Sequence, residues 1–284
     1  MKVIDSHLHV WANENESSLF PYADEKRPPE NLINISSTDD LLHNMQDAGV
    51  DGALIVQPIN YLYNHEYVSN AIKMYPDKFK GMMLFDPSLK PEDAVNRLEE
   101  LVLKGFVGVR FNPYLFDGEM SANGSAIAVM KRCGELQIPV GIMCFKGIEL
   151  HHSDIVKLCS SSPETVVILD HFGFAKVGRD DQFHLLLDLE RYNTVVKISA
   201  LFRVKGEDEA FPYEAVRKQR FEKLLQSYGA GRLLMGTDFP YVQLECGYRS
   251  TIETIKSWVS GEDDLKLIMS GTAERLFGVW GNDK

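Results

Sequence analysis

The sequence of 284 residues lacks several features that would point to particular classes of protein. Its four cysteines form no CxxC pair, which argues against a zinc ribbon or a disulfide framework and favours a reducing compartment. No apolar run is long enough to cross a membrane, and the first ten residues hold no signal-peptide core. We therefore expect no membrane partner and a cytoplasmic location, or an organelle if a transit peptide has been removed.

Basic charge is also scarce. Lys and Arg number 30 against 41 Asp and Glu, so the formal net charge is -11. Such a chain repels phosphate backbones, and neither GxGxxG nor GxxxxGK[ST] is present to cradle a nucleotide phosphate. We expect no nucleic-acid partner, and small-molecule chemistry is favoured.

What the sequence does contain is a regular alternation of strand-like and helix-like segments. Eight short runs rich in β-branched and apolar residues are separated by helix-like stretches. The runs are 3–9, 53–57, 81–86, 106–111, 139–144, 166–170, 195–199 and 233–238. This pattern predicts an α/β fold, namely a (β/α)₈ TIM barrel formed by residues 1–284 as one domain, with a doubly wound open sheet as the alternative.

The helix-like stretches carry recognisable start and stop signals. Thr38 and Asp39 precede a run that ends at Gly49, and Pro91 opens one that ends at Gly105. The others are 65–75, 125–137, 152–160, 180–191, 213–228 and a final pair after Tyr248. Residues 11–37 show no period and predict a long first βα loop, which is either a lid over the site or a surface excursion.

Two histidines end the first predicted strand. His7 and His9 are two residues apart, so their rings lie on one face of the strand, roughly 6.6 Å apart along the chain, and can chelate one cation. Asp5 shares this face one step lower. It could orient a histidine ring or close a hydrogen-bond network.

Further reactive residues follow other strands. His171 comes directly after the sixth apolar run, and Asp238 closes the eighth. Because the carboxyl ends of barrel strands meet at one mouth, we expect His7, His9, His171 and Asp238 to converge there. The sequence predicts that these four residues form the active site, with all four available as metal ligands.

Two arginines occupy similar positions. Arg110 ends the fourth run and Arg203 lies just past the seventh, where both could grip a carboxylate in a bidentate manner. Their positive charge would attract an anion into an otherwise acidic protein. The predicted partner is a small anionic metabolite, bound by Arg110 and Arg203 with help from Asn112, Tyr114 and Ser199, and the oligomeric state is left open.

The remaining candidates are weaker. Cys144 ends the fifth run and could bind zinc as a thiolate, although a buried cysteine is more often a small apolar side chain. Lys146 would act electrostatically at most. Surface roles are expected for the other histidines: His43, His65, His151, His152 and His184.

The motifs DSHLHVW, LDHFG, KISALFR and GTDFP give the chain an end-to-end resemblance to the amidohydrolase superfamily. It looks most like the amidohydrolase 2 branch, which includes 2-pyrone-4,6-dicarboxylate and sugar-lactone hydrolases, aminocarboxymuconate-semialdehyde decarboxylase relatives and similar plant homologues of unassigned function. The resemblance implies a barrel, with His7 and His9 at the family's first-strand pair, His171 at its sixth-strand histidine and Asp238 at its eighth-strand aspartate. It also implies that Arg110 and Arg203 bind substrate carboxylates.

The chain departs from the binuclear members of this superfamily. They place a lysine or glutamate on the fourth strand and a histidine on the fifth, whereas Arg110 and Cys144 stand here. The resemblance then implies either one divalent metal, with zinc expected, or metal-free catalysis. In the metal-free case, His7 and His9 would donate hydrogen bonds to the developing oxyanion.

These residues predict a hydrolase of a small carboxylate-bearing lactone or cyclic ester. Asp238 would act as general base on water, and His171 would polarise the carbonyl. One alternative is metal-dependent, non-oxidative decarboxylation of a small muconate-like or aromatic acid. Another is a barrel that binds an anion without catalysis.

Overall fold

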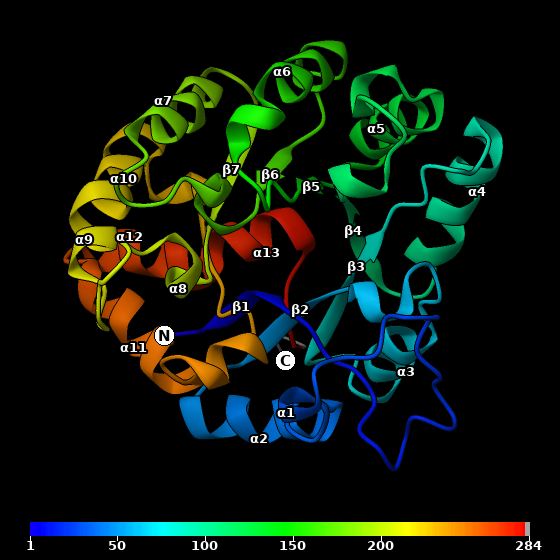
Figure 1. Ribbon diagram of the computed structural model, residues 1–284, viewed down its shortest axis with the longest axis horizontal. Helices are drawn as coiled ribbons and strands as arrows, with labels where there is room; N and C mark the ends of the chain where they lie inside the picture. Colours follow the sequence, from blue (N-terminus) through cyan, green and yellow to red (C-terminus); the bar gives the residue numbers. More distant parts are fainter. Residues whose placement is uncertain (282–284) are drawn as a thin grey trace.

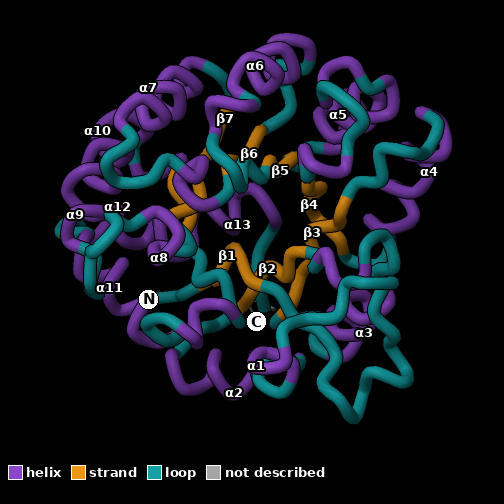
Figure 2. Tube along the Cα trace, in the orientation of Figure 1, coloured by secondary structure: helices purple, strands orange, loops and turns teal. Residues whose placement is uncertain are grey.

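The structure is a computed structural model that describes residues 1–281, and its eight strands form one parallel sheet in chain order (Figures 1 and 2). The first strand meets the segment just after the last strand at a parallel bridge between Leu8 and Phe239. There the backbone N–H of His9 donates to the carbonyl of Phe239 over 2.7 Å. The sheet therefore closes into the predicted (β/α)₈ barrel, and the doubly wound alternative is wrong.

Strands line the barrel and helices surround it. The strands are β1 (Ile4–Leu8), β2 (Gly52–Val56), β3 (Phe79–Leu84), β4 (Phe106–Phe111), β5 (Val140–Ile142), β6 (Val167–Leu169), β7 (Thr194–Ile198) and β8 (Leu233–Met235). The helices are α1 (Glu30–Ile33), α2 (Thr38–Ala48), α3 (Glu66–Met74), α4 (Pro91–Val102), α5 (Gly124–Leu136), α6 (His152–Ser161), α7 (Asp180–Asp188), α8 (Leu201–Val204), α9 (Glu214–Val216), α10 (Glu222–Tyr228), α11 (Tyr248–Trp258), α12 (Glu262–Lys266) and α13 (Thr272–Phe277).

Local sequence signals account for the helix ends. The side chain of Ser37 accepts from the backbone N–H of Asp40, whose carboxylate accepts from Ser37 in return, so α2 begins with a capping box. It ends at Gly49 in the left-handed conformation, at φ 67°. Within residues 1–281, no helix is both long and apolar enough to span a membrane.

The barrel is filled by side chains and closed at its amino-terminal end by the C-terminal segment. Ile4, Leu54, Ile168 and Leu234 are buried in one apolar cluster with Trp280. Trp280 donates from its indole nitrogen to the carbonyl of Ala53, and α13 crosses behind the strands in Figure 1. Because the amino-terminal end of the barrel, its lower end, is closed, an active site is expected at the carboxyl ends of the strands.

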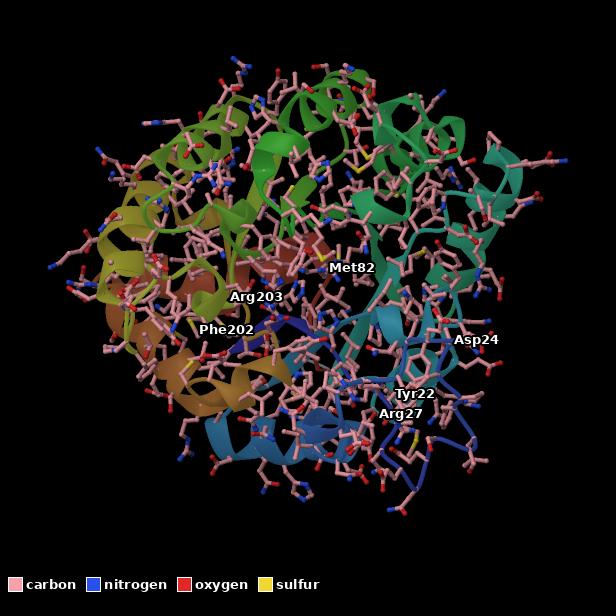
Figure 3. All side chains as sticks on the ribbon, in the orientation of Figure 1. Tyr22, Asp24, Arg27, Met82, Phe202 and Arg203 are labelled. Carbon is pink, nitrogen blue, oxygen red and sulfur yellow. The ribbon has the colours of Figure 1, made fainter. Side chains whose placement is uncertain are left out.

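The long first loop packs beside the barrel. Its Ala12 N–H bonds the Tyr61 hydroxyl over 2.8 Å, and the Asn60 side chain donates to the carbonyl of Lys26 over 2.7 Å. Figure 3 shows Tyr22 of this loop in a different part of the molecule from Arg203, which lies nearer the centre of the barrel. The loop therefore braces the segment after β2 from outside.

Candidate active site

A cavity of about 420 Å³ lies at the carboxyl ends of the strands. Its polar lining includes His9, Arg110, Asn112, His171, Arg203 and Asp238. Its apolar lining includes Ile59, Leu84, Met143, Phe145 and Phe174. None of the described lining residues comes from the first loop, so a lid role for residues 11–37 gains no support from this cavity. The size and mixed lining suit one small molecule.

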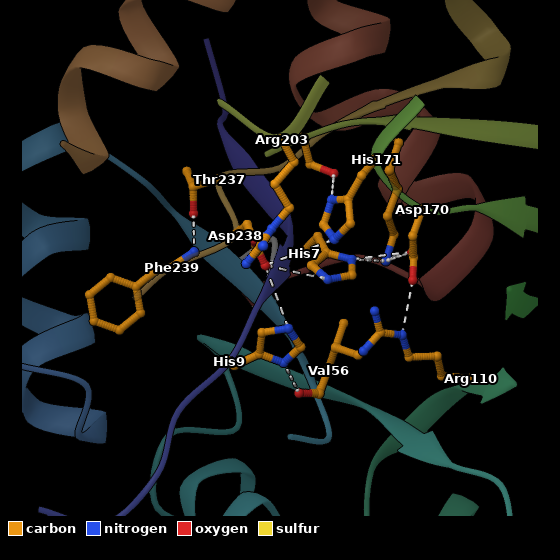
Figure 4. Close-up of polar contacts among 12 residues, drawn as sticks. His7, His9, Val56, Arg110, Asp170, His171, Arg203, Thr237, Asp238 and Phe239 are labelled. Atoms are coloured by element: carbon orange, nitrogen blue, oxygen red, sulfur yellow. Dashed lines mark hydrogen bonds and ion pairs between the residues drawn. The ribbon is translucent and has the colours of Figure 1, made fainter. Parts of the chain in front are cut away.

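Asp238 lies among three imidazole rings (Figure 4). Its Oδ1 atom is 3.6 Å from Nε2 of His9 and 3.9 Å from Nε2 of both His7 and His171. His7 lies on β1 and His9 just after it, His171 follows β6, and Asp238 follows β8. The barrel thus brings together the four residues expected to converge.

The backbone at two of these residues is unusual. His171 has φ 51° and Asp238 has φ 67°, in the left-handed region that few non-glycine residues adopt. The N–H of Asp238 donates to the carbonyl of His7 over 2.8 Å, which fixes the turn after β8. β6 ends at Leu169 and β8 at Met235, earlier than the apolar runs predict, and each turn follows within three residues. Such conformations gather at functional sites.

Both arginines are anchored through one nitrogen. Nε of Arg110 donates to Oδ2 of Asp170, and Nε of Arg203 donates to Oδ2 of Asp238, each over 2.9 Å. Arg203 also lies over the ring of Tyr241, 4.8 Å from its centroid. Within residues 1–281, the terminal guanidinium nitrogens of Arg110 and Arg203 make no hydrogen bond. They can therefore receive a ligand.

Two charged residues under this cavity escaped prediction. Asp170 and Lys197 are fully buried, and Nζ of Lys197 is 3.0 Å from Nδ1 of His7. Oδ1 of Asp170 lies 3.2 Å from that same Nδ1 and 3.3 Å from Nζ. The sequence signal was a lysine inside the apolar run VVKIS and an acid directly before His171.

The hydrogen bond of His9 fixes its ring proton. Nδ1 of His9 lies 2.8 Å from the carbonyl of Val56, which can only accept, so Nδ1 carries the proton and Nε2 a lone pair. The neutral ring then has no N–H to offer from Nε2. The expectation that His9 donates to an oxyanion is therefore wrong for this geometry.

Burial sets the protonation states of the site. Desolvation lowers the pKa of His9 to about 3, and desolvation followed by nearby charge lowers the pKa of His7 and His171 well below the usual value. Desolvation raises the pKa of Asp238 to about 6 even though Arg203 lowers it. For Asp170, desolvation acts upward, but Lys197 and its other cationic neighbours hold its pKa well below the usual value. At neutral pH the site holds neutral imidazoles beside carboxylates.

The other predicted binding residues differ in whether they line the cavity. Asn112 lines the cavity, and its side-chain oxygen caps the N–H of Tyr114. Tyr114 is outside the cavity lining, where its hydroxyl accepts from the N–H of Lys146. Ser199 is fully buried, and its Oγ is 2.8 Å from Nδ1 of His171. Ser199 therefore contacts a site residue from behind.

Three weaker candidates have structural surroundings. Asp5 accepts from the hydroxyl and N–H of Thr237 and from the N–H of His7, so it closes a hydrogen-bond network. Cys144 is fully buried, and burial raises the pKa of its thiol, which opposes a thiolate ligand. His65 is buried, contrary to the expected surface role, because its ring bonds Tyr63 and Leu84.

Three residues fit a metal ion. One donor atom each from His7, His171 and Asp238 lies within 4.8 Å of the others, and Nε2 of His7 is buried without a hydrogen-bond partner. Two imidazoles and a carboxylate are a usual donor set for zinc. Among the described residues, His9 is outside this group, although it was predicted as a ligand.

Comparison with solved structures supports the fold. A chain from Acinetobacter baumannii, described as a probable 2-pyrone-4,6-dicarboxylic acid hydrolase with citric acid bound, shares 21% identity at a TM-score of 0.78, over 98% of this chain and 100% of that one. A zinc-bound amidohydrolase from Burkholderia multivorans shares 16% sequence identity at a TM-score of 0.71, and the match covers 98% of this chain and 100% of that one. A 2,6-dihydroxybenzoate decarboxylase in complex with 2,6-dihydroxybenzoate shares 16% sequence identity at a TM-score of 0.69, and the match covers 98% of this chain and 100% of that one.

No curated protein sequence matches this chain significantly. A family model described as amidohydrolase matches residues 4–279, which is nearly the whole chain. That match covers every strand and all the residues around Asp238. The protein therefore belongs to the amidohydrolase family, in its amidohydrolase 2 branch.

Proposed function

We propose that this protein hydrolyses a small carboxylate-bearing lactone or similar cyclic ester. The observation that carries the proposal is Asp238, a carboxylate at the cavity wall with its pKa raised to about 6 and three neutral imidazoles around it. A general base works best when its pKa is near the working pH. Family membership supports an enzyme that acts on a small acid, as either a hydrolase or a decarboxylase.

The substrate anion would be held by the two guanidinium groups. Arg110 and Arg203 each keep their terminal nitrogens for a ligand, and a bidentate pair with a carboxylate uses two such nitrogens. The citric acid bound to the Acinetobacter baumannii relative supports a small anion as ligand. We propose that Asn112 adds a further polar contact, because it lines the same cavity.

In the proposed reaction Asp238 takes a proton from water as the water attacks the ester carbonyl. It later delivers that proton to the leaving alkoxide oxygen, so the ring opens to a hydroxy acid. In the metal-free version of the site, His171 would polarise the carbonyl through Nε2–H, with its Nδ1 accepting from Ser199. Arg203 holds Asp238 in place through the Nε bond.

We also propose a second version of the site, in which a divalent metal takes over the polarising role from Nε2–H of His171. His7, His171 and Asp238 would hold it, and zinc is the ion we propose from this donor set. When bound, such an ion supplies Lewis-acid polarisation of an oxygen at the reacting centre. The zinc-bound Burkholderia multivorans relative supports this choice.

Non-oxidative decarboxylation is the second candidate, favoured by the similarity to a dihydroxybenzoate decarboxylase. The same arginines would hold an aromatic or muconate-like acid. Product analysis with a panel of lactones and aromatic acids separates the two: ring-opened hydroxy acid supports the lactonase, and carbon dioxide release supports the decarboxylase. Binding of anions with neither product would favour the non-catalytic barrel.

A further inference from the structure

We propose that Lys197 and Asp170 are opposed positioning residues, which decide where the neutral ring of His7 carries its proton and thereby set the affinity of the site for a divalent metal. Lys197 favours the proton on Nε2 and opposes metal binding. Asp170 favours it on Nδ1 and promotes metal binding. The inference rests on the proposed metal ligands, and it assigns roles to two residues that make no contact with the cavity.

The geometry is a closed triangle of polar atoms beneath the cavity. Nζ of Lys197, Nδ1 of His7 and Oδ1 of Asp170 lie 3.0, 3.2 and 3.3 Å apart in pairs. All three side chains are fully buried, so water does not compete for these contacts. Nδ1 of His7 therefore has two rival neighbours of opposite hydrogen-bonding character.

An ammonium group can only donate, and a carboxylate can only accept. When Lys197 donates to Nδ1 of His7, that nitrogen has no proton, and the proton is on Nε2, which lies 3.9 Å from Oδ1 of Asp238. When Nδ1–H is instead given to Asp170, Nε2 presents a lone pair. The contact from Lys197 to Nδ1 has hydrogen-bond geometry at 3.0 Å, whereas Oδ1 of Asp170 has no hydrogen-bond partner among the described residues, which favours the first arrangement.

Binding a metal through Nε2 of His7 requires the second arrangement. The ring loses its proton at Nε2 and gains one at Nδ1, so its net charge is unchanged. Lys197 then gives up its bond to Nδ1 and keeps its contact with Oδ1 of Asp170, 3.3 Å away. A ligating histidine that donates its other N–H to a carboxylate is the usual arrangement around protein-bound metals.

The other rings of the site lack this competition. His9 faces the carbonyl of Val56, which fixes its proton on Nδ1. His171 faces the hydroxyl of Ser199, which can donate or accept and so permits either form. Among these three rings, only His7 has an obligate donor at Nδ1, so the bond from Lys197 is the specific barrier to metal binding.

The first test observes the wild-type protein directly. Nitrogen-15 NMR of ¹⁵N-histidine-labelled, metal-free wild-type protein, with His7 assigned by its absence in His7→Gln, should show a neutral ring protonated at Nε2. Addition of Zn²⁺ should move the proton to Nδ1. A wild-type His7 protonated at Nδ1 before zinc is added would overturn the proposal, whether or not the protein proves to be a lactonase.

The second test measures Zn²⁺ affinity by competition with a chromophoric chelator. Lys197→Met should bind zinc about tenfold more tightly and move the His7 proton to Nδ1, whereas Asp170→Asn should bind about 10–100-fold more weakly. Lys80→Met, at the opposite end of the barrel on β3, should match wild type. Parallel losses in both site variants would indicate a merely structural role and would contradict the proposal. Thermal unfolding identifies a variant that fails to fold, in which case the wild-type spectrum decides.

Discussion

Nε of Arg203 donates to Oδ2 of Asp238 over 2.9 Å, so a single guanidinium both steadies the proposed base and faces the cavity. The charged hydrogen bond holds one carboxylate oxygen and leaves Oδ1 facing the three imidazoles. The two functions of Arg203 can be separated by experiment, because one concerns proton transfer and the other concerns substrate charge.

Replacing Asp238 by Asn should lower kcat by a factor of about 10²–10⁴ while leaving ligand binding nearly unchanged. The amide keeps the shape of the side chain but cannot accept the proton of water. Steady-state kinetics and calorimetric binding of a substrate analogue measure the two quantities. Asp181→Asn, on the exposed surface, is the control. A kcat close to wild type in Asp238→Asn would end its assignment as general base.

The pH profile follows from the same residue. Burial raises the pKa of Asp238 to about 6, and the base must be deprotonated to act, so kcat should fall as pH decreases through about 6. Arg203 lowers this pKa, and Arg203→Met should therefore move the midpoint to higher pH. Profiles recorded with a saturating neutral lactone check both statements. A midpoint that moves to lower pH in the variant would contradict them.

Arg110→Met should raise KM for carboxylate-bearing lactones about ten- to a hundred-fold, since a charged hydrogen bond is worth roughly 1.5–3 kcal/mol. The variant also removes a partner of buried Asp170, so the informative comparison is between substrates within one protein. The KM of the variant for a neutral lactone should change little. Equal losses for charged and neutral lactones would show that Arg110 serves the structure alone.

The lower end of the barrel offers a test of the fold. A Cβ atom added at Gly52 would lie 2.3 Å from Cδ1 of Trp280, so Gly52→Ala should reduce the free energy of unfolding by about 1–3 kcal/mol. Gly231→Ala is a matched control, because no atom lies within 4 Å of its added Cβ. Chemical denaturation compares the two variants. Equal stability would mean that Trp280 moves aside at little cost.

Apolar runs that alternate with helix-like stretches predicted a parallel sheet closed into a barrel, because each strand is buried on both faces and reads as a short continuous run. The same pattern left a doubly wound open sheet as the alternative. The positions of His171 and Asp238 at strand ends were also predictable, since parallel strands share one mouth. What the pattern could not predict were the left-handed turns at these two residues. Their φ values depend on contacts such as Asp238 N–H to His7 carbonyl, made between distant strands.

The roles of buried charges were equally hidden. Lys197 reads as a polar interruption of β7, and only packing against β1 and the end of β6 places it beside His7 and Asp170. The proton position on His9 likewise depends on the carbonyl of Val56, on a neighbouring strand. Backbone partners carry no side-chain signal, so sequence patterns cannot show which ring nitrogen is protonated.

The bridge between Leu8 and Phe239 joins β1 to the segment just after β8, and the proposed site lies beside it. Asp5 and Thr237, which bond to each other beneath the site, are 232 positions apart in the chain. A growing polypeptide therefore cannot form the proposed acid–base centre until nearly all of it has been synthesised, and a fragment that stops before β8 lacks Asp238 altogether. Turnover at the proposed site would therefore require that the segments near the two ends of the chain have come together in the folded protein.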